Sequence, residues 1–190
     1  MAMLAVSCLS SFALRAIEPF LVLYAVNVIG FTKTSYGLLE TVRGLLATIF
    51  AMPGGILSDK FGRKKLILSS RLLVPFMPLG LVLLRHFNHV FILYVIIGIG
   101  YGLGSDISGR AGGAAWQALV TDLSPYRDRG KVLGLMSTVT GLTSTPASLT
   151  GGYLWEAYNP NSLMFTSFTL SVIAVLFFSF FVKEPKEREK

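Results

Sequence analysis

Three pairs of opposite charges lie inside the long apolar segments of this 190-residue sequence. The pairs are Arg15 with Glu18, Glu40 with Arg43, and Asp106 with Arg110. A spacing of three or four residues places both members of a pair on one face of a helix. A charge at the centre of a bilayer costs about 2.5–3.5 kcal/mol even on the lenient insertion scale. We therefore expect such pairs to face a bundle interior or a wet cavity, where they could bind a solute or an ion.

Each pair also has a simpler interpretation, in which the arginine and the acid merely neutralise each other within their own helix. This interpretation is favoured for Glu40 and Arg43, because both lie only a turn or two from the end of their apolar segment. For the pairs in the first and fourth apolar segments we prefer the cavity, where charges are tolerated and used.

Motifs for covalent chemistry are absent from the sequence, which contains no HExxH, GxSxG, phosphate loop or cysteine pair. His86 and His89 are spaced like metal ligands, but they sit in a short connection without a third ligand nearby. Cys8 is the only cysteine, so no disulfide can form within the chain. We expect a protein that is not an enzyme and that uses no cofactor and no metal.

The composition is that of a membrane protein. Apolar residues make up 53% of the chain and charged residues only 14%, whereas about a quarter of the residues in a soluble domain are charged. The net charge of +7 is therefore not interpreted as a nucleic-acid footprint. Basic residues in short loops between apolar spans orient a protein in the bilayer and meet anionic lipid headgroups.

Six apolar spans can be drawn, at residues 2–29, 35–57, 66–84, 90–120, 130–155 and 163–182. We expect one membrane domain over residues 1–182, followed by a charged cytoplasmic tail at 183–190. The loops after the second and fourth spans, together with this tail, hold twelve basic residues, whereas the opposite side holds Lys33 and Arg85. The positive-inside rule then predicts a multi-pass protein of the cell membrane with both termini in the cytoplasm.

Between the second and third spans the chain reads GGILSDKFGRKK over residues 54–65. Glycine permits the sharp turn that we expect near Gly62. The stretch resembles the signature loop of the major facilitator superfamily, whose pattern is roughly G-x-L-a-D-[RK]-x-G-R-[RK]-[RK]. The matching residues are Gly55, Leu57, Asp59, Lys60, Gly62, Arg63, Lys64 and Lys65.

A second match lies after the fourth span, where Asp122, Pro125, Arg129 and Gly130 resemble the D-x2-P-x3-R-G ending found in many members of this family. The resemblance implies that Asp122 pairs with Arg63 and that Asp59 lies against a helix N-terminus, latching one transport conformation. The gating residues it implies are Gly55, Asp59, Gly62, Arg63, Lys64, Lys65, Asp122 and Arg129.

The distribution of charge among the spans also resembles that family, in which the first and fourth helices line a central cavity and the third and sixth face lipid. The central-cavity residues that this implies are Arg15, Glu18, Asp106 and Arg110. The body of the third span carries only Arg71, which we expect to snorkel to the nearby surface. The sixth span is rich in phenylalanine and has no charge.

Glycines at alternate positions mark the fourth span, at Gly98, Gly100, Gly102 and Gly104. We expect them to allow close packing against other helices through small-xxx-small contacts. The alternative is a bendable helix that gates the cavity.

Six spans make half of a full family member, and the resemblance therefore implies an all-α membrane protein built from two inverted three-helix repeats. The C-terminal half is the better match, because Tyr94 stands four residues before Gly98 where N-terminal halves often carry an arginine. The implied function is a secondary-active transporter, or half of one, that moves a small molecule or ion by alternating access. The alternative is a non-transporting membrane scaffold or a truncated remnant. The implied partners are the lipid bilayer and a second six-helix half, either a homodimer or a complementary chain, with no nucleic acid.

Overall fold

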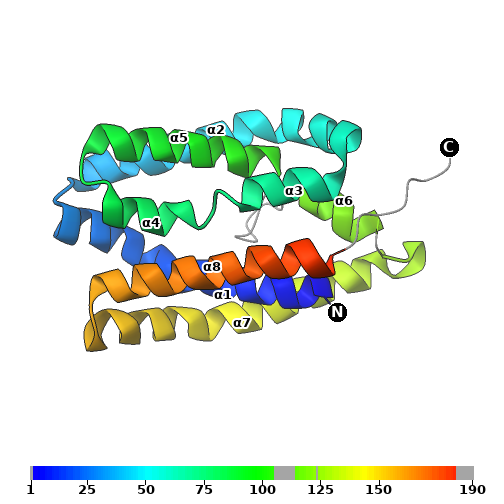
Figure 1. Cartoon of the computed structure of the whole chain (residues 1–190). Helices are drawn as coiled ribbons and strands as arrows, with labels where there is room; N and C mark the ends of the chain where they lie inside the picture. Colours follow the sequence, from blue (N-terminus) through cyan, green and yellow to red (C-terminus); the bar gives the residue numbers. More distant parts are fainter. Residues whose placement is uncertain (1, 105–113, 123, 183–190) are drawn as a thin grey trace.

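The computed structural model describes residues 2–104, 114–122 and 124–182, and these residues are predominantly helical, with no strand among them. In chain order the elements are α1 (Ala2–Leu23), the π-helix η1 (Tyr24–Ile29), α2 (Lys33–Phe61), α3 (Arg63–Arg71), α4 (Phe76–Leu83), α5 (Phe87–Leu103), α6 (Ala114–Asp122), the 3-10 helix η2 (Tyr126–Asp128), α7 (Arg129–Ala157) and α8 (Pro160–Phe181). Figure 1 shows the longer helices lying roughly along one common direction, with the shorter ones between them.

Four of the six apolar spans expected from the sequence have a counterpart among the described helices that is long and apolar enough to cross a membrane. Segments long and apolar enough to cross a membrane are Leu4–Ile29, Lys33–Phe61, Arg63–Leu83 and Pro160–Phe181. The described part of the fourth span consists of α5 and α6, and α7 is the fifth. The prediction of an all-α membrane protein is confirmed.

The third span is not one continuous helix, as the sequence interpretation had it. It breaks into α3 and α4, and short-range bonds from the N–H of Leu73 to the carbonyl of Ser70 and from that of Val74 to Arg71 turn the chain between them. Pro75 precedes α4 and Pro78 lies within its first turn. Proline has no backbone N–H and clashes with the preceding turn, so two prolines so close together interrupt the helix.

The helices form two groups, joined where α4 packs against α8 (Figure 1). In one group α2 and α3 pack against α5, and in the other α1 packs against α7 and α8. The first, second and third spans can be matched with the fourth, fifth and sixth. Under this matching the contact of α1 with α7 corresponds to the contact of α5 with α2. The contact of α1 with α8 corresponds to the contacts of α5 with α3 and α4. The packing therefore has the internal symmetry of two three-helix repeats.

The glycines of α5 are packed against two different helices. A Cβ atom added at Gly102 would lie 2.7 Å from the carbonyl oxygen of Ala47 in α2, and one at Gly104 would lie 2.8 Å from that of Leu66 in α3. Gly98 likewise faces α2, and Gly100 faces the side chain of Leu73, in the turn between α3 and α4. Side chains would not fit at these distances, so the close-packing prediction is confirmed for this part of the span.

Candidate functional site

A sharp turn, called the corner below, joins α2 to α3 at one end of the bundle. Helix α2 ends at Phe61, Gly62 has φ 94° and ψ 133°, and α3 begins at Arg63. This positive φ favours glycine, because a side chain would clash with the backbone. Gly62 therefore lets two helices meet with a single residue between them, as its place in the signature loop led us to expect.

Arg63 lies between two carboxylates at the corner. Its guanidinium donates to Asp59 Oδ1 at 3.2 Å and forms an ion pair with Asp122 Oδ2. Asp59 belongs to the last turns of α2, whereas Asp122 ends α6, 59 residues after Arg63 along the chain. The pairing of Asp122 with Arg63 that the resemblance implied is therefore present. Asp59 reaches the first residue of α3 through the Arg63 side chain, and its expected interaction with a helix N-terminus stays a prediction.

Burial differs within this cluster. The Arg63 and Asp122 side chains are about three-quarters buried, at 25% and 27% exposed, whereas Asp59 is 67% exposed. Solvent screening leaves exposed pairs with about 0–1 kcal/mol, so the Arg63–Asp122 contact contributes more than the Arg63–Asp59 contact. The stronger contact is also the one that connects distant parts of the chain.

The neighbouring lysine ties the corner to a third part of the chain. Lys64 Nζ donates to the carbonyl oxygen of Ser179, at 2.9 Å, near the end of α8. Lys65 is exposed. The corner thus connects α2, α3, α6 and α8 at one end of the bundle.

Two other residues expected at the gate lie apart from the Arg63 cluster. Arg129 starts α7 and lies over the ring of Tyr126, with its guanidinium carbon 5.0 Å from the centroid. The carbonyl of Gly55 accepts a hydrogen bond from the Ser58 hydroxyl at 2.7 Å, inside α2. These contacts are local and give neither residue a partner across the corner.

Arg71 does not snorkel, and the sequence-based expectation was wrong. Its side chain is 2% exposed, and its guanidinium carbon lies 4.3 Å from the ring centroid of Trp116 and 4.7 Å from that of Phe178. Stacking on aromatic faces contributes about 2 kcal/mol or more when the cation is desolvated. Arg71 therefore joins α3 to α6 and α8. The signal in the sequence was an aromatic residue near the same end of two other spans.

Of the four central-cavity residues, two are described. Arg15 and Glu18 form an ion pair at 2.8 Å in α1 and remain 30% and 41% exposed. Asp106 and Arg110 lie outside the described residues, so a shared cavity stays a prediction. Ser148 of α7 donates to the carbonyl of Arg15 at 3.4 Å, which places the pair beside α7.

The ion pair of Glu40 and Arg43 makes further contacts with two nearby tyrosines. Arg43 Nε donates to Glu40 at 3.2 Å, and the Tyr36 hydroxyl donates to the same carboxylate at 3.1 Å. The Arg43 guanidinium also lies 5.3 Å from the ring centroid of Tyr101 on α5. With its charges paired and stacked, this cluster favours the interpretation that the pair neutralises itself.

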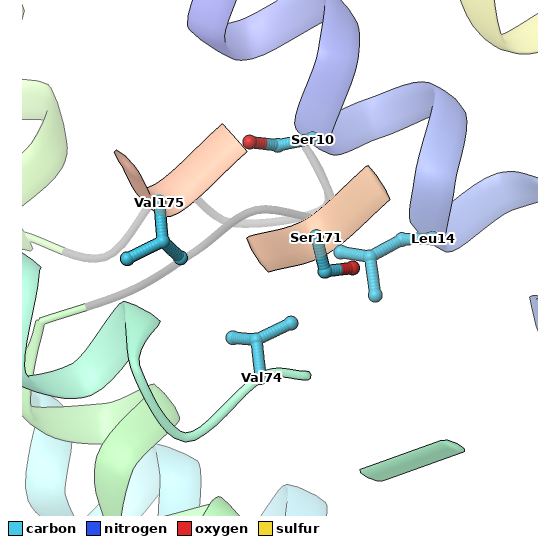
Figure 2. Close-up of a pocket in the computed structure, with 5 residues that line it drawn as sticks. All are labelled: Ser10, Leu14, Val74, Ser171 and Val175. Atoms are coloured by element: carbon cyan, nitrogen blue, oxygen red, sulfur yellow. The ribbon is translucent and has the colours of Figure 1, made fainter. Parts of the chain in front are cut away.

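A small cavity between α1, α8 and the break in the third span is shown in Figure 2, lined by Ser10, Leu14, Val74, Ser171 and Val175. Its volume of about 10 Å³ is room for at most one water molecule. This cavity cannot hold a solute.

Comparison with known proteins agrees with this architecture. The family model described as Major Facilitator Superfamily matches residues 3–190. The chain is 37% identical over 131 residues to an uncharacterised MFS-type transporter of Methanocaldococcus jannaschii, which covers 69% of the chain and 31% of that protein. It is 28% identical to the class H tetracycline resistance protein of Pasteurella multocida, covering 82% of the chain and 36% of the relative.

A third relative is the arabinose-proton symporter of Bacillus subtilis, which is 28% identical over 70% of the chain and 30% of the relative. The chain thus spans about a third of the length of these curated relatives. Family match, helical architecture and corner agree, and the chain belongs to the Major Facilitator Superfamily.

Proposed function

We propose that this chain is a six-helix half of a secondary-active transporter, which moves a small solute or ion across the cell membrane by alternating access. Its family and its transporter relatives support this function. The observation that carries the proposal is the position of Arg63 between Asp59 and Asp122. This cluster joins α2 of the first three-helix repeat to α6 of the second. A movement of one repeat relative to the other would therefore strain these ion pairs.

In this proposal the Arg63 cluster acts as a latch on the cytoplasmic side. The Arg63–Asp122 pair stabilises one arrangement of α2 and α6, and the other arrangement forms when the pair is lost. A coupling of about 1–3 kcal/mol changes the ratio of two states by about 5–150-fold. A partly buried ion pair has an energy in this range, so it can bias the equilibrium without locking it.

The solute site is assigned to the charges of the first and fourth spans, Arg15, Glu18, Asp106 and Arg110. The remaining exposure of Arg15 and Glu18 supports this assignment, because a pair on α1 that is 30–41% exposed needs a wet or proteinaceous neighbour more than hydrocarbon. Two acids and two bases give a neutral site. The named relatives are a tetracycline resistance protein and an arabinose-proton symporter. For this chain we propose only the broad substrate class of small solutes and ions.

A single half leaves such a site open on one side, so we assign the transport activity to a pair of halves with both termini of each in the cytoplasm. The second half is either another copy or a complementary chain. An even number of spans gives both halves the same orientation, so a parallel two-fold pair is geometrically allowed.

The latch is tested by Asp122→Asn with Asp128→Asn as its matched control. Asp128 lies in the same loop and pairs with Lys131 at 2.9 Å, three residues away, so its loss leaves the corner intact. We expect Asp122→Asn to shift thiol labelling of a cysteine at Arg15 between the two sides of the membrane by about fivefold or more. Asp128→Asn should match the parent. Equal labelling in both variants would contradict the latch.

Transport itself is tested in vesicles holding the full chain, screened with a panel of solutes under proton and sodium gradients. Uptake that collapses with the gradient supports a secondary transporter. A chain that moves no solute, alone or with a second half, is the non-transporting scaffold or remnant.

A further inference from the structure

The ion pair at the corner has a counterpart at the opposite end of the bundle. There the Tyr24 hydroxyl donates a hydrogen bond to Asn161 Oδ1 at 2.5 Å, between residues that stand 137 positions apart in the chain. Tyr24 is the first residue of η1, directly after α1, and Asn161 lies in the first turn of α8. The bond therefore joins the first span of one three-helix repeat to the last span of the other.

A sequence repeat relates the two ends. Residues 37–55 of α2 read GLLETVRGLLATIFAMPGG, and residues 134–152 of α7 read GLMSTVTGLTSTPASLTGG, with nine of the 19 positions identical. Helix α2 leads into the corner, and α7 leads into the turn before α8. These two connections lie at opposite ends of the bundle (Figure 1), as an inverted repeat requires.

The shift of 97 residues that aligns these two stretches also aligns the two contacts. It matches Asn161 with Lys64 and Tyr24 with Thr121. The direct neighbours of Lys64 and Thr121 form the corner ion pair, which consists of Arg63 and Asp122. At both ends of the bundle, therefore, the start of one span holds the end of a span from the other repeat, within one residue of the equivalent position.

The donor and the acceptor of the hydrogen bond are both held in place. The Asn159 side chain caps α8 and accepts from the backbone N–H of Asn161 at 3.0 Å, which fixes the turn that carries the amide. Tyr24 is 3% exposed, and the ring of Trp155 packs edge-on against it, with 6.4 Å between the centroids. Phe20, one turn earlier in α1, stacks on the same indole. A buried hydroxyl that loses its partner is costly, so this neutral bond contributes to holding α1 against α8.

The two ends make the equivalent contact with different chemistry. The corner lies among basic residues, whereas the loops of the opposite side hold only Lys33 and Arg85. Tyrosine and tryptophan suit that end, because an apolar ring with a polar tip is favoured at a membrane–water interface. The π-helix that begins at Tyr24 is a second mark of the position, since π-helical turns occur frequently at functional sites.

We propose that the hydrogen bond between Tyr24 and Asn161 is an outer latch, the counterpart of the Arg63–Asp122 latch at the corner. Both contacts are formed in this structure, which in this proposal is the state closed on both sides. Opening the cytoplasmic side breaks the corner pair, and opening the outer side breaks the Tyr24–Asn161 bond. This inference rests on the alternating access proposed above and adds two positioning residues to it.

The outer latch is tested by Tyr24→Phe, which removes the hydroxyl and keeps the ring. The matched control is Tyr158→Phe, the same change at the same end of the bundle on a residue that is 70% exposed. Both are made in the full chain with Cys8→Ser and the Arg15→Cys reporter. We expect Tyr24→Phe to raise the ratio of outside to cytoplasmic labelling by about threefold or more, the factor for one neutral hydrogen bond. Asp122→Asn should lower this ratio, and Tyr158→Phe should leave it unchanged.

Two combined variants separate a latch from a contact that only stabilises the fold. Tyr24→Phe together with Asp122→Asn should return the labelling ratio toward that of the parent, because each side has then lost one contact. Tyr24→Phe together with Asn161→Leu should shift the ratio no further than either change alone, because both changes remove the same bond. A general loss of stability would not produce opposite shifts that cancel.

The outcomes distinguish this inference from the function on which it rests. A labelling ratio that Tyr24→Phe leaves at the control value, or moves in the same direction as Asp122→Asn, would overturn the outer latch. If Tyr24→Phe raises the ratio and Asp122→Asn leaves it unchanged, the outer latch stands and the corner latch fails. Because labelling needs no solute, a chain that shows both shifts but moves no solute would overturn only the proposed transport.

Discussion

Replacing Gly54 by alanine tests the tight packing of α2 on α5. The new Cβ would lie 2.6 Å from the carbonyl oxygens of both Gly102 and Leu103, and 2.7 Å from the Cα of Leu103. Ordinary contact begins at 3.4 Å, so the helices must separate by about 0.8 Å, the difference between the two distances. A gap of about 0.5–1 Å forfeits a quarter to a half of each dispersion contact that it opens.

Alanine also favours the helix over glycine by about 1 kcal/mol, and this gain must be subtracted. Gly44→Ala in the same helix has the same gain but meets nothing within 4 Å, so the difference between the variants isolates the clash. We expect Gly54→Ala to be about 1–3 kcal/mol less stable than Gly44→Ala. That difference lowers the unfolding midpoint by about 2–12 °C for a chain of this size.

The assay is thermal unfolding of both purified variants in one detergent, at a dilution that keeps the chain monomeric. Equal midpoints for Gly54→Ala and Gly44→Ala would refute the close approach of α2 to the α5 backbone. A midpoint of Gly44→Ala below that of the parent would show that this position is not open in the monomer.

Three further results are expected. A cysteine at Lys65 should be labelled only from the cytoplasmic side and one at His89 only from outside, and the reverse pattern would contradict the orientation. Arg71→Lys should lower the free energy of unfolding by about 1–2 kcal/mol and alter Trp116 fluorescence, because an ammonium cannot stack as a planar guanidinium does; an unchanged protein would show that stacking contributes nothing. Gly62→Ala should cost about 1–3 kcal/mol, since φ 94° strains any side chain, and a neutral result in the same unfolding assay would contradict the sharp corner.

The spans and the corner were predictable because each depends on a local property of the sequence. Apolar length defines a membrane segment, and Gly62 between charged residues defines a turn. The contact of Arg63 with Asp122 was predictable only from the resemblance, because 59 residues separate the two side chains. Whether the contact gates transport stays a prediction.

The features that sequence reasoning missed depend on how helices meet. Pro75 and Pro78 indicate a break in the third span, but the span was drawn from the length of its apolar run alone. Arg71 was expected to reach water because only its distance from the end of its span was considered, and not the side chains of other helices. Trp116 and Phe178 lie far from it in the sequence and reach it only when α3, α6 and α8 pack.

The partners of α1 have a consequence for the synthesis of the chain. Its backbone is held by late residues: the Ser167 hydroxyl donates to the carbonyl of Ala13 across 154 residues, and Ser148 donates to that of Arg15 across 133. At a translation rate of about 5–20 residues per second, α1 waits about 8–30 s for these partners. By contrast, α2, α3 and α5 lie within about seventy residues of one another and can pack early. A ribosome that stalls within α7 therefore leaves α1, with its ion pair, without its main packing partners in the bilayer.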